Sequence, residues 1–190
     1  MQRLWVTGYR SYELNVFNLT DPKVMVITYA LKNYYQQLQQ ENGLDWIISG
    51  GNLGIEQWAL SAAIELHPQL PHLKAAMMTP YMQFEQHWNE KNQIQYEALK
   101  KQVDFFASTS QNTYQNPQQL RNYQRFMLHH TDRAVLVYDL EHPGKPKYDY
   151  EVICHYQKQH QYPLDLIDFY SLEDAAEDYQ ELKQSDDFSQ

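Results

Sequence analysis

The sequence is poor in cysteine, in glycine and in positive charge. Its 190 residues include one cysteine and six glycines, and 24 acidic side chains exceed 15 basic ones, which gives a net charge of −9. A single cysteine forms no internal disulfide, so the composition fits a reducing compartment and predicts a cytoplasmic location. An acidic average surface repels phosphate backbones and anionic lipid, which argues against nucleic acid as a partner.

Long apolar runs and metal-ligand spacings are also missing. No segment approaches the roughly 18 consecutive apolar residues of a membrane-spanning helix, so we expect no membrane insertion. Residues 1–5 lead straight into a strand-like segment and are not expected to be a cleavable leader. His129 and His130 are adjacent and would point to different helix faces, so we expect no metal site. Cys154 lies near an apolar helical stripe and is expected to be a buried thiol instead of a nucleophile.

Strand-like and helix-like patterns alternate along the whole chain. Short apolar or β-branched runs occur at residues 4–7, 46–49, 73–78, 103–107, 134–138 and 164–169. The segments between them repeat apolar residues with a period near 3.6, as in the helix expected to begin at Asp21 and Pro22 and to stop at Gly43. The alternation predicts an α/β fold in a single domain, a doubly wound and mainly parallel Rossmann-like sheet flanked by helices.

The end of the chain has a different character. Ser171 followed by Asp174 resembles a capping box, which predicts a short last helix. No linker-like stretch or internal repeat divides the sequence. We therefore expect one domain over residues 1–183 and a polar tail over residues 184–190.

The most specific local feature is a glycine-bearing turn between the second strand and the next helix. Ser49, Gly50 and Gly51 end the strand, and Gly54 opens the helix. Glycine permits close approach, and backbone N–H groups beside a helix N-terminus can converge on an anion. The turn predicts a phosphate site, on the condition that no side chain of the protein fills it. The alternative is a tight structural turn without a ligand.

Other candidate ligand residues follow the same edge of the predicted sheet, where open parallel sheets bind ligands. Arg10 could pair with phosphate and Tyr9 could stack on a base, although a solvated arginine and a loop tyrosine are the plainer alternatives. The full set of further candidates is Thr7, Gly8, Tyr9, Arg10, Thr79, Pro80, Tyr81, Arg121, Asn122, Asp139 and Lys147.

Glu56 lies in the first turn of the helix that Gly54 opens. A glutamate there is favourable for the helix dipole alone. Alternatively, its carboxylate accepts hydrogen bonds from ribose hydroxyls, or it acts as a general base if burial raises its pKa. Trp58 fits the apolar stripe of the same helix and is expected to pack in the core.

These motifs resemble the YpsA-like family of Gram-positive bacteria. The resemblance is carried by residues 6–10, 46–58, 136–139 and 146–148 and extends to about residue 170. The family is placed in the SLOG superfamily, with Rossmann-like Smf/DprA DNA-processing proteins and LOG phosphoribohydrolases. The resemblance implies a nucleotide-derived ligand, with NAD or ADP-ribose the usual suggestion, and a link to cell division or stress. The family's glycine motif falls on Gly50, Gly51, Gly54 and Glu56, with Trp58 beside it.

The sequence departs from the enzymatic relatives at one motif. They carry Pro-Gly-Gly-x-Gly-Thr-x-x-Glu, whereas residues 144–151 keep Glu151 at a plausible spacing and lack the phosphate-binding glycines and the threonine.

Three hypotheses follow for the function. The first is a regulatory or sensing protein that binds a small nucleotide-derived ligand. The second is an N-glycosidic nucleotide hydrolase that uses Glu56 or Glu151 as its acidic residue. The third is a protein-interaction module, with protein partners or a homo-oligomer formed through surfaces rich in its 16 tyrosines.

Overall fold

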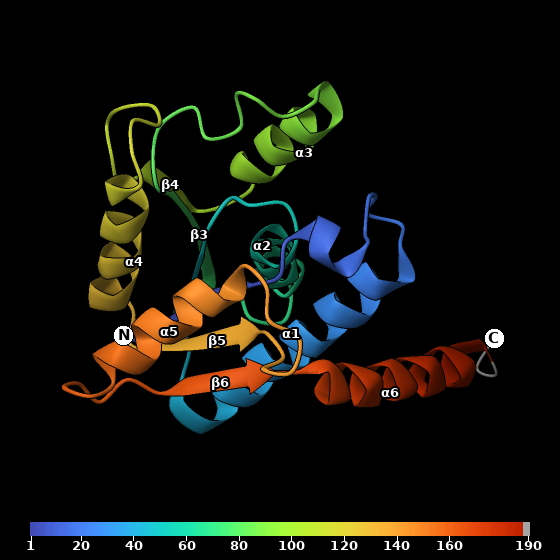
Figure 1. Ribbon diagram of the computed structural model, residues 1–190. Helices are drawn as coiled ribbons and strands as arrows, with labels where there is room; N and C mark the ends of the chain where they lie inside the picture. Colours follow the sequence, from blue (N-terminus) through green and yellow to red (C-terminus); the bar gives the residue numbers. More distant parts are fainter. Residues whose placement is uncertain (188–190) are drawn as a thin grey trace.

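The computed structural model describes residues 1–187, which form a parallel sheet covered by helices on both faces (Figure 1). Neighbouring strands are parallel throughout, in the order β4-β3-β2-β1-β5-β6. This arrangement confirms the predicted α/β class and the doubly wound Rossmann-like sheet. The strands are β1 (Arg3–Gly8), β2 (Trp46–Ser49), β3 (Lys74–Thr79), β4 (Phe105–Ser108), β5 (Arg133–Val137) and β6 (Leu164–Ile167).

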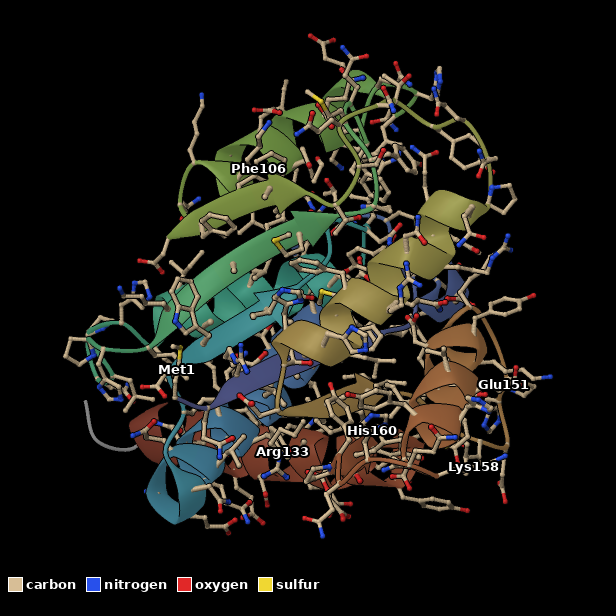
Figure 2. All side chains as sticks on the ribbon, turned by 90° about the vertical axis from the view of Figure 1, so that its left-hand side faces the viewer. Met1, Phe106, Arg133, Glu151, Lys158 and His160 are labelled. Carbon is tan, nitrogen blue, oxygen red and sulfur yellow. The ribbon has the colours of Figure 1, made fainter. Side chains whose placement is uncertain are left out.

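The helices lie in two layers. In Figure 2, α4 and α5 cross the face of the sheet that is turned toward the viewer, and α1, α2 and α6 lie behind it. Because both faces are covered, residues Leu4, Trp5 and Val6 of the central strand are completely buried. The helices are η1 (Ser11–Leu14), α1 (Pro22–Asn42), α2 (Ile55–Glu65), α3 (Glu90–Lys100), α4 (Gln118–His130), α5 (Pro146–Tyr156) and α6 (Phe169–Asp187).

Helix α1 shows how local sequence sets the element boundaries. The Asp21 side chain accepts a hydrogen bond from the backbone N–H of Lys23, and Pro22 takes the first helical position, where no N–H partner is needed. Gly43 ends the helix with a φ of 74°, a conformation that glycine adopts without a steric penalty. Both boundaries agree with the prediction.

The direction of winding reverses between β1 and β5. The chain runs outward from β1 through β2 and β3 to β4, and α4 then carries it back to β5 on the other side of β1. The loops that follow β1 and β5 diverge at this point, which is where doubly wound sheets form a ligand crevice. Glu13 joins the two loops, because its carboxylate accepts hydrogen bonds from the backbone N–H groups of Arg10 and Lys145, both at 2.7 Å.

The last helix differs from its prediction. It begins at Phe169, and Asp168 provides the cap by accepting hydrogen bonds from the backbone N–H and the hydroxyl of Ser171, each at 2.8 Å. The predicted pairing of Ser171 with Asp174 is therefore wrong. Helix α6 also continues to Asp187, into the segment expected to be a polar tail, because it packs along α1, where Tyr179 meets Tyr29. The remaining residues of that predicted tail, 188–190, lie outside the described residues.

None of the helices in residues 1–187 combines the length and the apolar character that crossing a membrane requires.

Candidate functional site

A cleft of about 800 Å³ opens at the carboxyl edge of the sheet. This volume lies in the range of small-molecule sites in proteins. The loop after β3 forms one wall, and the first turns of α4 and α5 form the opposite one. Among its lining residues are Arg10, Asn52, Glu56, Pro80, Tyr81, Phe84, Trp88, Arg121, Tyr123, Gln124, Lys145, Tyr148 and Asp149.

Glu56 is the central acidic group of the cleft floor and is only 3% exposed. One carboxylate oxygen lies 3.1 Å from the Thr7 hydroxyl and 3.5 Å from the Arg10 guanidinium. The other accepts hydrogen bonds from the backbone N–H and the side-chain amide of Asn52, both at 2.8 Å. A buried carboxylate needs such donors, because an unpaired charge in the interior is costly.

The glycine turn is filled by the protein itself. A Cβ atom on Gly50 would overlap the Glu56 carboxylate, and one on Gly51 would lie 2.7 Å from the Tyr96 ring. The amide of Asn52 already donates to Glu56. The structure therefore contradicts the predicted open cup for phosphate, and these glycines make room for neighbouring side chains.

Gly54 allows the backbone at the start of α2 to approach the loop after β1. Its φ of 118° suits glycine alone, and it lies against the loop after β1, where it forms an isolated bridge with Arg10. The backbone N–H of Ile55 donates to the carbonyl of Tyr9 at 3.1 Å. The start of α2 is thereby fixed to the loop that carries Arg10.

Asp149 is a second buried acid of the floor, and the sequence analysis missed it. It lies in the first turn of α5, with 9% of its surface exposed. One carboxyl oxygen accepts a hydrogen bond from the Gln124 amide at 2.8 Å, and the other lies 3.3 Å from the Thr7 hydroxyl. Burial raises the pKa of Asp149 to about 6, against a smaller lowering by the hydrogen bond from Gln124.

Thr7 joins the two acids through one hydroxyl. A hydroxyl carries a single proton, so Thr7 can donate to only one carboxylate at a time. When it donates to Glu56, a protonated Asp149 supplies the proton for the second contact. Thr7 therefore links Glu56 and Asp149 through one hydroxyl.

The position of Asp149 has a signal in the sequence. It comes three residues after Pro146 and four before Ile153, and both of these are buried on α5. Helical spacing thus turns Asp149 toward the sheet. The predicted acid Glu151, labelled in Figure 2, is instead 58% exposed and lies 3.6 Å from the ammonium of Lys147. Neither Glu151 nor Lys147 is part of the cleft lining, and their predicted roles stay predictions.

We expect Asp149 to make stability fall as the pH rises. Its carboxyl binds a proton more tightly in the folded protein, where its pKa is about 6, than in the unfolded chain, where about 3.9 is usual. Between pH 4 and 6 the folded state therefore holds more protons, so the free energy of unfolding decreases as the pH increases through this window. The loss at pH 8 should be about 2–3 kcal/mol.

Urea denaturation between pH 4 and 8 tests this expectation. Asp149→Asn should remove the decrease and be more stable than the wild type at pH 8. Glu151→Gln, an exposed acid of the same helix, is the matched control and should keep the wild-type profile. An Asp149→Asn profile parallel to that of the wild type would contradict the expectation.

Arg10 and Tyr123 complete the polar floor. Burial lowers the pKa of Arg10, but Glu56 and Asp149, with smaller contributions from Tyr123 and Glu13, raise it more, so the guanidinium stays charged. The hydroxyl of Tyr123 is buried and has no hydrogen-bond partner among residues 1–187. Burial raises the pKa of this phenol well above its ordinary value, so it remains a neutral donor.

Tyr9 and Asp139 lie away from the cleft lining. The Tyr9 ring is buried against Tyr138 and Phe169, and its hydroxyl donates to the carbonyl of His142 at 2.6 Å. Stacking of Tyr9 on a base is therefore contradicted. Asp139 accepts hydrogen bonds from the backbone N–H groups of Glu141 and Phe169. These bonds satisfy its carboxylate without a ligand and lower the pKa of Asp139.

Several other predicted residues support the strands. The Ser49 hydroxyl donates to the carbonyl of Val6 at 2.6 Å, and the hydroxyls of Thr79 and Ser108 form a hydrogen bond of 2.8 Å. A Cβ on Gly8 would lie 2.6 Å from the carbonyl of Val137. These residues hold the sheet edge on which the cleft is built and do not line the cleft.

The predicted site residues that do line the cleft are Arg10, Glu56, Pro80, Tyr81 and Arg121. Thr7 lies beneath them, and Asn122 is an exposed neighbour of Arg121 that is not part of the lining. The largest group that sequence reasoning missed is aromatic. Phe84, Trp88, Tyr123 and Tyr148 line the cleft with Tyr81.

Trp58 is 3% exposed, which confirms its place in the core. Cys154 is only partly buried, in contrast to the expected buried thiol, and a hydrogen bond between it and Tyr150 raises the pKa of that tyrosine. In the described part of the chain, no three His, Cys, Asp or Glu side chains converge to hold a metal ion.

Comparison with known proteins gives consistent matches over most of the chain. The family model YpsA, described as "YspA SLOG family", matches residues 4–172. A UPF0398 protein of Lactobacillus helveticus is 61% identical over 190 residues, which is 100% of both chains. Another, of Lactobacillus gasseri, is 62% identical over 181 residues, or 95% of each, and that of Lactiplantibacillus plantarum is 53% identical over 189 residues, covering 100% of this chain and 99% of its own. The family match confirms the resemblance seen in the strand and glycine motifs.

Proposed function

The chain belongs to the YspA SLOG family, and from this premise we propose that it binds a nucleotide-derived small molecule in the cleft, in a regulatory or sensing role. One observation carries the proposal. The cleft combines an aromatic wall with a floor of two buried carboxyl groups joined by Thr7. A nucleoside has a flat base that can stack on the aromatic wall and sugar hydroxyls that can bind the carboxyl groups of the floor.

The aromatic wall supports a place for the base. Tyr81 and Phe84 have ring centroids 5.2 Å apart, and Phe84 and Trp88 have centroids 5.6 Å apart. Tyr148 lines the cleft from α5 and is 65% exposed. Bases stack on such side chains with little dependence on sequence.

The charges of the cleft support an orientation for the ligand. Glu56 and Asp149 accept hydrogen bonds from sugar hydroxyls and repel a phosphate. Two further cationic side chains, Arg121 and Lys145, line the cleft on α4 and at the start of α5. We therefore place the sugar on the floor, the base against the aromatic wall and the phosphate beside these two cations.

The protonation of Asp149 favours a second candidate, hydrolysis of the N-glycosidic bond. A carboxylic acid with a pKa of about 6 can protonate a departing base near neutral pH, while the second carboxylate stabilises positive charge on the sugar. Water then adds to the anomeric carbon as the bond to the base breaks. Free base would appear in solution.

Melting temperature in the presence of nucleotides tests the proposal. AMP, GMP, CMP, UMP, NAD and ADP-ribose are compared at millimolar concentration. A ligand at a hundred times its Kd stabilises the folded state by about 2.7 kcal/mol, which raises the Tm by about 5–10 °C in a protein of this size. The absence of a shift with all six compounds would refute nucleotide binding. Chromatography of the same samples for free base distinguishes hydrolysis from binding alone.

Arg121→Ala provides the positional test. It should weaken AMP binding by about tenfold and leave adenosine binding unchanged, because the arginine is placed on the phosphate. Arg125→Ala is the control, since this arginine lies one turn further along α4 and does not line the cleft. Equal effects of the two substitutions would contradict the proposed orientation.

A further inference from the structure

Tyr123 carries an unused hydrogen-bond donor beside the cleft. Its side chain lines the cleft floor from α4, and the residue is 8% exposed. Its hydroxyl is fully buried and has no hydrogen-bond partner in the described part of the chain. A buried hydroxyl without a partner opposes folding, so its position beside the candidate site calls for an external acceptor.

The groups around this hydroxyl restrict what the acceptor can be. The phenol lies within 2.9 Å of the position that a Cβ on Gly50 would take, directly beside the Glu56 carboxylate. Glu56, Asp149 and Arg10 all act electrostatically on it. The next residue on α4, Gln124, is the one that holds Asp149. The phenolic donor therefore lies beside the Glu56 carboxylate and within electrostatic reach of Asp149.

We infer that Tyr123 is a specificity-determining residue that donates a hydrogen bond to a ligand hydroxyl. The same ligand hydroxyl donates a hydrogen bond to the carboxyl group of Glu56 or Asp149. The inference rests on the proposed function and names the part of the ligand that the floor recognises. A hydroxyl both accepts and donates, so it satisfies the phenol and a carboxylate together. A phosphate oxygen accepts from the phenol but is repelled by the carboxylates, and a methylene satisfies neither.

The ligand class that follows is a ribonucleotide with a free 2′ or 3′ hydroxyl. A deoxy analogue leaves the Tyr123 hydroxyl without a partner in the bound state. Sites built around a substrate hydroxyl discriminate strongly against analogues that lack it, for this reason. Tyr123 should thus separate ribose from deoxyribose ligands.

Titration calorimetry of three proteins tests the inference. The probes are AMP, GMP, CMP and UMP, each with its 2′-deoxy and 3′-deoxy counterparts. The wild type should prefer a ribonucleotide over one of its deoxy counterparts by about tenfold or more. Tyr123→Phe should bind that ribonucleotide about tenfold more weakly, bind the deoxy counterpart as the wild type does, and melt at the same temperature or higher.

Tyr96→Phe is the matched control. The Tyr96 hydroxyl is also buried and without a partner among residues 1–187, but Tyr96 does not line the cleft. This variant should keep the wild-type preference for ribose.

The outcomes separate the inference from the function on which it rests. If the wild type binds a ribonucleotide and Tyr123→Phe keeps the same ribose preference, the inference is overturned and the proposed function stands. Equal losses in the two phenylalanine variants would assign the effect to packing and also overturn it. If none of the four ribonucleotides binds, the inference falls, and the proposed function falls with it unless NAD or ADP-ribose shifts the Tm.

Discussion

Gly54→Ala is expected to lower the free energy of unfolding by about 3–5 kcal/mol. Two effects add at this position. The backbone has φ 118° and ψ −138°, a region that residues with a side chain rarely adopt. A Cβ atom would also lie 2.5 Å from the backbone nitrogen of Ser11 and 2.6 Å from the carbonyl oxygen of Tyr9. These atoms belong to the backbone and cannot move aside as a flexible side chain would.

Urea denaturation of Gly54→Ala and Gly43→Ala measures the two effects separately. Gly43 also has a positive φ, 74°, but no atom lies within 4 Å of its added Cβ. Its substitution should cost about 1–3 kcal/mol, the penalty of the positive-φ backbone alone. If both variants lose the same stability, the contact between α2 and the loop after β1 is not the reason for the glycine.

Glu56→Ala is expected to destabilise the protein by about 3–5 kcal/mol, because it leaves buried donors without an acceptor. The substitution removes the counter-charge of Arg10 and both hydrogen bonds from Asn52. It also opens a space beside Gly50. The loss should appear in urea denaturation at pH 7.

Glu65→Ala provides the comparison within the same helix. Glu65 pairs with Lys32 at 2.7 Å, but its side chain is 53% exposed. An exposed pair contributes about 0–1 kcal/mol, so this variant should be close to the wild type. Similar losses at Glu65 and Glu56 would contradict the structural role assigned to the buried acid.

Local patterns in the sequence were enough to predict the strands and both boundaries of α1. Alternating strand and helix periodicities, with Asp21, Pro22 and Gly43 around α1, carry the necessary information within a few residues. The length of α6 was missed, because packing against α1 sustains a helix whose own sequence looks polar.

The floor of the cleft could not be predicted in the same way. Thr7 lies 49 residues from Glu56 and 142 from Asp149, so only the fold brings the three together. The glycine turn shows the limit most clearly. Gly50 has the same sequence signature whether it admits a phosphate or a carboxylate of its own chain, and only the contacts of Glu56 distinguish the two. Asp149 was missed for a different reason, since its helical spacing from the buried Ile153 already indicated that it faces the sheet.

The two hydrogen bonds that Glu13 accepts from the loops after β1 and β5 bear on the free energy with which the cleft can bind a ligand. Because one carboxylate fixes the backbone at both Arg10 and Lys145, these segments already have the conformation in which they face the cleft. A ligand then loses little free energy to the ordering of its receptor, so more of its contact energy is expressed as affinity. Glu13 fixes both segments although its own side chain is not part of the cleft lining.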